Sequence, residues 1–74
     1  MKSKIGFVGL GISNYRLLRV LRKECPSSSF FVSDMGSIEG EALEFLRDSG
    51  IEYEDNGHTE RLMECGSFIV SPGV

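Results

Sequence analysis

The sequence predicts an α/β fold: a Rossmann-like, three-layer arrangement around a parallel sheet of four strands. Short apolar runs alternate with stretches of helical periodicity, the connections between them are short, and the first run ends in a glycine turn. Because crossovers between parallel strands are right-handed, we expect the strand order 3-2-1-4. A chain of 74 residues makes one domain, and its formal net charge of -3 gives no general attraction to nucleic acid.

The first strand and its turn, residues 5–14, read IGFVGLGISN. A central strand is expected over residues 4–8, and Gly9 and Gly11 let the backbone approach a bound phosphate or ribose. The segment matches the first two glycines of G-x-G-x-x-G, and Asn14 takes the place of the third. This departure argues against a standard dinucleotide site and leaves a mononucleotide or a single phosphate possible.

An amphipathic helix is predicted after the glycine turn. Ser13 is a suitable N-cap, the leucines at positions 17, 18 and 21 form the apolar side, and Pro26 ends the helix. Basic residues follow another side, and we interpret them as a solvated face because the chain is acidic and no aromatic residues lie among them. We predict no nucleic-acid partner.

A second strand, a second helix and a capping glycine follow in order. The strand covers residues 30–33 and ends at Asp34. Ser37 is expected to cap a helix that runs to about Ser49, and Gly50 stands in the usual C-cap position.

The last third of the chain predicts two strands around a short helix. Residues 51–54 have the polar alternation of an edge strand, and Thr59 is a suitable cap for the helix. Residues 67–71 are expected to form a buried fourth strand that stops at Pro72. Apolar surface on that strand, with no helix after it, indicates a truncated piece of a larger enzyme.

The predicted strand order opens a crevice between the first and fourth strands, at their carboxyl ends. Asp34 follows the glycines at the distance where an acidic side chain accepts hydrogen bonds from a ribose or a base edge, although a turn-forming aspartate explains it too. A plain turn also explains residues 71–73. The candidate binding residues are Gly9, Gly11, Ile12, Ser13, Asn14, Asp34, Met35, Ser71, Pro72 and Gly73.

Neither a catalytic set nor a metal site is predicted. The two cysteines lack metal-ligand spacing, and His58, the one histidine, is interpreted as structural because it is a lone histidine in a loop. The chain contains no G-x-x-x-x-G-K-[ST] motif for ATP. Its apolar stretches are far shorter than the roughly 20 residues that span a bilayer, and no secretory signal is evident, so we expect a cytoplasmic protein without a membrane partner.

Four motifs together resemble the N-terminal domain of the Mur ligases, closest to the MurD type. They are VGLGISN after the first strand, an aspartate that closes the second, GHT before the short helix and SPGV after the fourth strand. Met35 and Gly36 stand where the family often has polar or basic residues. The resemblance covers essentially all of residues 1–74 and implies one N-terminal domain that binds the UDP-linked muramoyl substrate.

The resemblance also implies what the rest of such an enzyme does. Central and C-terminal domains, missing from this fragment, would bind ATP, magnesium and D-glutamate and form an amide through an acyl phosphate. By motif position, Ile12 and Ser13 would lie along the diphosphate and uridine, and Asp34 would accept from uracil or ribose. Ser71 and Gly73 would border the pyrophosphate or sugar.

Two other functions stay open on the residues alone. Two glycines and Asp34 would also suit half of an NAD- or FAD-binding module from an oxidoreductase or a regulatory domain. We rank it second because only one mononucleotide-sized half is present and Asn14 replaces the third glycine. The third is a non-enzymatic interaction domain that uses an open strand edge.

Overall fold

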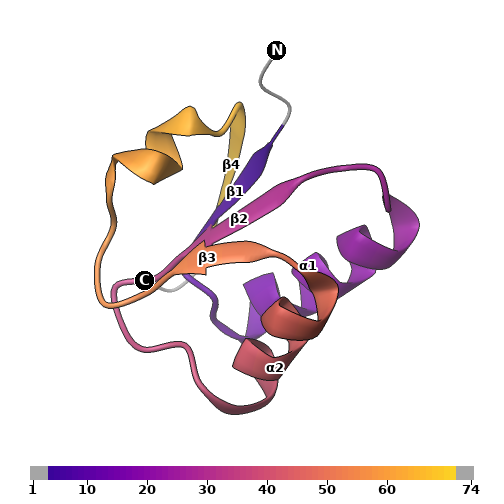
Figure 1. The fold of residues 1–74 in the computed structure, drawn as a ribbon, viewed down its shortest axis with the longest axis horizontal. Helices are drawn as coiled ribbons and strands as arrows, with labels where there is room; N and C mark the ends of the chain where they lie inside the picture. Colours follow the sequence, from indigo (N-terminus) through magenta and orange to yellow (C-terminus); the bar gives the residue numbers. More distant parts are fainter. Residues whose placement is uncertain (1–3, 72–74) are drawn as a thin grey trace.

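A four-stranded parallel sheet separates two unequal helical layers (Figure 1). The computed structural model describes residues 4–71. The strands are β1 (Ile5–Val8), β2 (Phe30–Ser33), β3 (Glu52–Glu54) and β4 (Ser67–Val70). Their order, β3-β2-β1-β4, confirms the predicted order 3-2-1-4.

The helices lie on both faces of the sheet, as expected. Helices α1 (Ile12–Glu24) and α2 (Gly40–Ser49) cover one face, and the 3-10 helix η1 (Glu60–Glu64) lies on the other (Figure 1). The connections β1–α1–β2 and β2–α2–β3 step across the sheet in one direction, and β3–η1–β4 steps back past both strands. Right-handed crossovers therefore place η1 opposite the two long helices.

Alternation along the strands divides the apolar side chains between these two faces. Phe7 and Val32 are register partners and pack with Leu18 and Leu46 in the core beneath α1 and α2. On the η1 face a Cβ added to Gly6 would lie only 2.9 Å from the Sγ of Cys65. The central strand can thus approach the η1 segment closely because it has no side chain there.

The predicted N-caps of both long helices are wrong. Helix α1 begins one residue before Ser13, with Gly11 as its N-cap. Ser37 lies outside α2 and donates from its Oγ to Oδ1 of Asn56 at 3.1 Å. Because the amide N of Asn56 also donates to the carbonyl O of Gly36 at 3.0 Å, the segment before α2 is tied to the loop after β3 and enters the helix later.

The prediction of a buried fourth strand is also wrong. Phe68 and Val70 of β4 are 46% and 62% exposed. These side chains alternate onto the η1 face at the edge of the sheet. The η1 segment packs on the inner strands instead, with Cys65 beside Gly6 of β1 and Arg61 over the ring of Phe31 in β2. By contrast, the predicted left-handed C-cap at Gly50 is confirmed by its φ of 68°, and Thr59 accepts from the amide of Arg61 as an N-cap.

Candidate functional site

A cavity of about 280 Å³ opens at the carboxyl ends of the strands, where the crevice was predicted. Five of the predicted binding residues meet there, although they come from three separate segments of the chain. We call this cavity the crevice; it is lined by Val8, Gly9, Leu10, Gly11, Asp34, Met35, His58, Val70 and Ser71.

The glycine turn brings β1, β2 and β4 together at one wall of the crevice. Gly9 has a φ of +85°, and its amide donates to the carbonyl O of Ser33 at 2.7 Å. A Cβ at Gly9 would lie 3.1 Å from the Cβ of Ser71, and one at Gly11 would lie 2.9 Å from its Oγ. The glycines therefore admit the end of β4 as well as exposing backbone to the cavity.

Helix α1 starts directly beside this turn, at Ile12. The first intrahelical bond runs from the amide of Tyr15 to the carbonyl O of Gly11 at 2.8 Å. No acidic residue occupies the first turn, and the glycine N-cap supplies no side-chain acceptor. The first amides of a helix lack intrahelical partners and carry the positive end of its dipole, so this position favours an anion. Ile12 and Ser13 are exposed here, beside the residues that line the crevice.

Asp34 joins the two loops that border the crevice. Its Oδ2 accepts from the amide of Leu10 at 2.7 Å, and its Oδ1 accepts from the amide of Gly36 at 2.8 Å. The turn-forming role considered from the sequence is therefore present. A carboxylate oxygen can accept two hydrogen bonds, so Asp34 retains acceptor capacity beyond these two. Its contact with a ligand stays a prediction.

Asn14 lies beneath the turn and does not line the crevice. The residue is 2% exposed, and its Nδ2 donates to the carbonyl O of Gly9 at 2.8 Å and to that of Ile69 at 3.3 Å. One amide group thus holds the glycine turn against β4. In place of the third glycine of a dinucleotide motif, the chain has a buried polar tether.

The other predicted residues are placed as follows. Met35 lines the crevice and is 69% exposed, which leaves an apolar surface next to Asp34. Ser71 is buried against the glycine turn, and its amide donates to the carbonyl O of Val8 at 2.9 Å. Pro72 and Gly73 lie outside the described residues.

A hydrogen-bonded cluster that the sequence did not reveal lies at the far wall of the crevice. The Oγ of Ser33 donates to Oε2 of Glu54 at 2.6 Å and lies 2.5 Å from Nδ1 of His58. Thr59 donates to Glu54 from its amide at 2.8 Å and from its Oγ1 at 2.5 Å. Desolvation by burial raises the pKa of Glu54, but the hydrogen bonds from Ser33 and Thr59 outweigh it, so the pKa is lowered. The cluster therefore links His58, through Ser33, to Glu54, an acid that stands four positions before it in the sequence.

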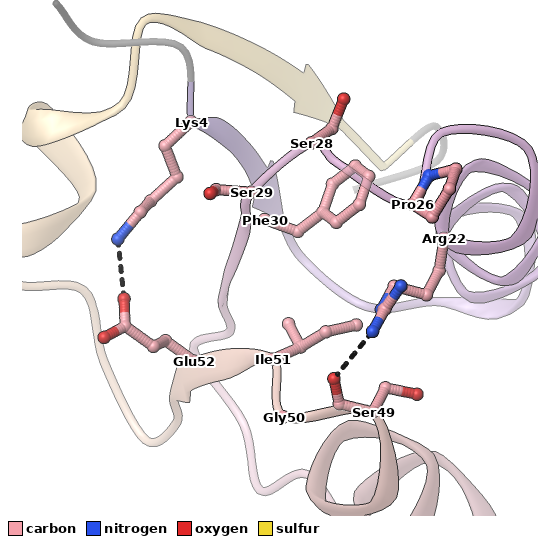
Figure 2. A pocket seen from close by; sticks show the side chains of 10 residues that line it. All are labelled: Lys4, Arg22, Pro26, Ser28, Ser29, Phe30, Ser49, Gly50, Ile51 and Glu52. Carbon is pink, nitrogen blue, oxygen red and sulfur yellow. Dashed lines mark hydrogen bonds and ion pairs between the residues drawn. The ribbon is translucent and has the colours of Figure 1, made fainter.

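A second cavity, of about 340 Å³, lies at the opposite end of the strands, where β1, β2 and β3 begin (Figure 2). Figure 2 shows its two cations already engaged: Arg22 donates to the carbonyl O of Ser49 at 3.3 Å, and Lys4 pairs with Glu52 at 2.6 Å. Helices α1 and α2 both end there, with the negative ends of their dipoles. The crevice is accordingly the better site for an anionic ligand.

Among residues 4–71, no group of three or more His, Cys, Asp or Glu residues could hold a metal ion. No helix in this part of the chain is both long enough and apolar enough to cross a membrane.

Comparison with known proteins gives consistent matches. The MurD N-terminal domain family matches residues 4–74. A UDP-N-acetylmuramoylalanine--D-glutamate ligase of Thermotoga petrophila is 46% identical over 71 residues, which cover 96% of this chain and 16% of that protein. The ligase of the same name from Thermotoga maritima is 45% identical with the same coverage, and that of Chlorobaculum tepidum is 43% identical over 44 residues, 60% of this chain and 10% of the relative. The chain spans about 16% of the length of the Thermotoga relatives.

Proposed function

This chain belongs to the MurD N-terminal domain family, and from that premise we propose that its crevice binds the uridine diphosphate end of UDP-N-acetylmuramoyl-L-alanine. One observation carries the proposal: an uncapped helix start, a glycine turn and a half-buried carboxylate border one cavity of about 280 Å³. Pockets for small molecules usually measure about 300–1,000 Å³, so this volume suits one nucleoside better than a dinucleotide.

The charges around the crevice orient such a ligand. The diphosphate would lie at the start of α1, against the amides of residues 11–13, because the helix dipole favours negative charge there. Asp34 would repel phosphate and accept from the ribose, and Met35 offers an apolar surface to the uracil ring. The nucleotide would thus extend from β1 toward β3.

We extend the proposal to the complete protein on the names of its relatives, which state a ligase and both of its substrates. It would join D-glutamate to the muramoyl substrate, with ATP and magnesium as the resemblance implies. The residues of this chain fit neither group, because it has no P-loop sequence and residues 4–71 hold no metal-ligand cluster. This domain would hold the nucleotide of the substrate, and the reaction would take place on other domains.

The alternative, half of an NAD- or FAD-binding module, has less support. It rests on the two glycines and Asp34, and the family match favours the ligase. In addition, Asp34 bonds to the amide of Leu10, which removes one amide of the turn from contact with a pyrophosphate.

Titration of the ¹⁵N-labelled chain tests the proposal. UDP and UDP-N-acetylmuramoyl-L-alanine should shift the amide signals of residues 11–13 and 34–36, and NAD should shift them less. No shift with either uridine nucleotide, or a larger response to NAD, would refute the assignment.

A charge at the helix start provides a sharper test. Ser13→Glu places a carboxylate in the first turn of α1, where it suits the helix dipole but repels a diphosphate. We expect the fold to be retained and UDP affinity to fall at least about tenfold, since 1.4 kcal/mol of repulsion suffices. Ser27→Glu is the matched control: it makes the same change in net charge on the exposed loop after α1. Equal affinities in the two variants would contradict a diphosphate at α1.

A further inference from the structure

We propose that His58 binds the base of the nucleotide, with its Nε2 accepting a hydrogen bond from the imide N–H of uracil. The inference rests on the proposed function, because it requires a uridine nucleotide in the crevice. It assigns a recognition role to a residue whose sequence context indicated only a structural one.

The first step is the direction of the hydrogen bonds around Ser33. Its hydroxyl is fully buried and has one proton, which it donates to Oε2 of Glu54. An ionised carboxylate only accepts, and Glu54 also accepts twice from Thr59. The lowered pKa of Glu54 agrees with an ionised group. Ser33 therefore has only lone pairs to offer its other partner.

The second step fixes the tautomer of His58. Its Nδ1 lies 2.5 Å from the Oγ of Ser33 and must supply the proton of that bond. A neutral imidazole has one N–H, so Nε2 carries a lone pair and acts as an acceptor. Because Nε2 lies across the ring from the buried Ser33, it points away from that anchor. The cluster thus presents a fixed acceptor on an exposed ring that lines the crevice.

The third step is the position of His58 along the sheet. The strands run β1, β2, β3 from the proposed diphosphate position, and Asp34 and His58 follow β2 and β3 in turn. A nucleotide with its diphosphate at α1 would pass its ribose by Asp34 and carry its base toward His58. Uracil has an imide N–H on its ring edge, whereas cytosine has an acceptor at the same atom. A fixed Nε2 acceptor would therefore favour UDP over CDP.

Two substitutions separate recognition from structural anchoring. In His58→Asn, the new side chain has an amide N near the position that Nδ1 occupied and can keep the bond to Ser33, but it has no group near the former position of Nε2. In His58→Gln, the longer side chain can place its amide oxygen, an acceptor, near the former position of Nε2. Dissociation constants for UDP, CDP, N3-methyl-UDP and 2′-deoxy-UDP would be measured at pH 8, where an ordinary imidazole is neutral.

We expect the wild-type chain to prefer UDP over CDP and N3-methyl-UDP, and His58→Asn to weaken the binding of UDP and of 2′-deoxy-UDP by the same factor. His58→Asn should bind UDP about tenfold more weakly, the value of one hydrogen bond, and leave CDP binding unchanged. His58→Gln should recover part of the loss. Equal UDP binding by the wild type and His58→Asn would refute the inference, and so would a loss in His58→Asn that depends on the 2′-hydroxyl.

A measurement without ligand keeps the inference testable if His58→Asn folds poorly. The ¹H–¹⁵N spectrum of the imidazole in the free wild-type chain should show a protonated Nδ1 and an unprotonated Nε2 at pH 8. The opposite tautomer would overturn it. If UDP fails to shift residues 11–13 in the wild type, the proposed function fails together with this inference; if UDP shifts them but His58→Asn binds normally, this inference alone fails.

Discussion

Replacement of Asn14 should show how much one buried amide contributes to the assembly of the crevice. Its Nδ2 donates to two carbonyl oxygens, those of Gly9 and Ile69, at 2.8 and 3.3 Å. Asn14→Ala removes both bonds and leaves both oxygens without this donor. Asn14→Asp keeps the shape of the side chain but turns an acceptor toward them.

The expected cost of Asn14→Ala follows from these two bonds. At about 1 kcal/mol for each buried hydrogen bond, the free energy of unfolding should fall by about 2 kcal/mol. A domain of this length has about 4–11 kcal/mol in total, so the loss is a large fraction. The melting temperature of so small a domain should fall by about 8–16 °C.

The aspartate variant should be less stable still at neutral pH. A buried carboxylate without a partner costs about 3–5 kcal/mol. Because burial raises the folded-state pKa of such a group, the folded state binds the proton more tightly than the unfolded chain does. The stability of Asn14→Asp relative to Asn14→Ala should therefore rise as the pH falls through that raised pKa, when the protonated group regains a donor.

Chemical denaturation at pH 7 and pH 5 measures both effects. Ser13→Ala, on the exposed side of the same helical turn, is the control and should change stability by less than about 0.5 kcal/mol. A loss below 0.5 kcal/mol in Asn14→Ala, or identical stabilities of the Asp and Ala variants at both pH values, would show that the amide does not tether the turn.

Three other substitutions test the structure elsewhere. Gly9→Ala should lower the free energy of unfolding by about 2–3 kcal/mol, because a positive φ of 85° and a contact of 3.1 Å between the new Cβ and Ser71 act together. Gly40→Ala is the control, since Gly40 has a positive φ but open space around it, and should lower the free energy of unfolding by about 1–2 kcal/mol. Equal losses in the two variants would exclude an effect of the contact. Leu46→Ala empties a fully buried position and should lower the free energy of unfolding by about 2–5 kcal/mol, whereas a loss below 1 kcal/mol would contradict its place in the core. Burial raises the pKa of Glu54 less than hydrogen bonds lower it, so its carboxylate stabilises the fold at pH values above its ordinary pKa of 4.5 and loses that effect as the pH falls through the lowered pKa. Glu54→Gln should therefore have a lower free energy of unfolding than the wild type at pH 7, and the difference, measured by denaturation, should shrink toward pH 3. A difference that stays constant over this range would refute the role of the charge.

The fold was predictable because its signals are local or follow from chain handedness. The apolar run at residues 30–33 and the glycine at position 50 placed a strand and a helix end where the structure has them. Right-handed crossovers then left few strand orders, and 3-2-1-4 is the observed one.

The helix starts were predicted less well because a polar residue near a helix has several possible partners. Ser37 is a good cap by type, yet Asn56, nineteen positions later, takes its hydroxyl proton. A long-range contact prevailed over a local preference, and a sequence without known contacts does not contain that information.

The sequence by itself determined the alternation of strands and helices, the strand order, and the meeting of Gly9, Asp34 and Ser71 at one edge, because parallel strands bring their carboxyl ends together. Only the tertiary structure decided the hydrogen bonds made by these groups. Asn14 turned inward as a tether, and Ser33 joined Glu54 to His58 across β2 and β3. The physical reason is range: apolar periodicity acts within one element, whereas a hydrogen bond needs two atoms from distant segments placed within about 3 Å.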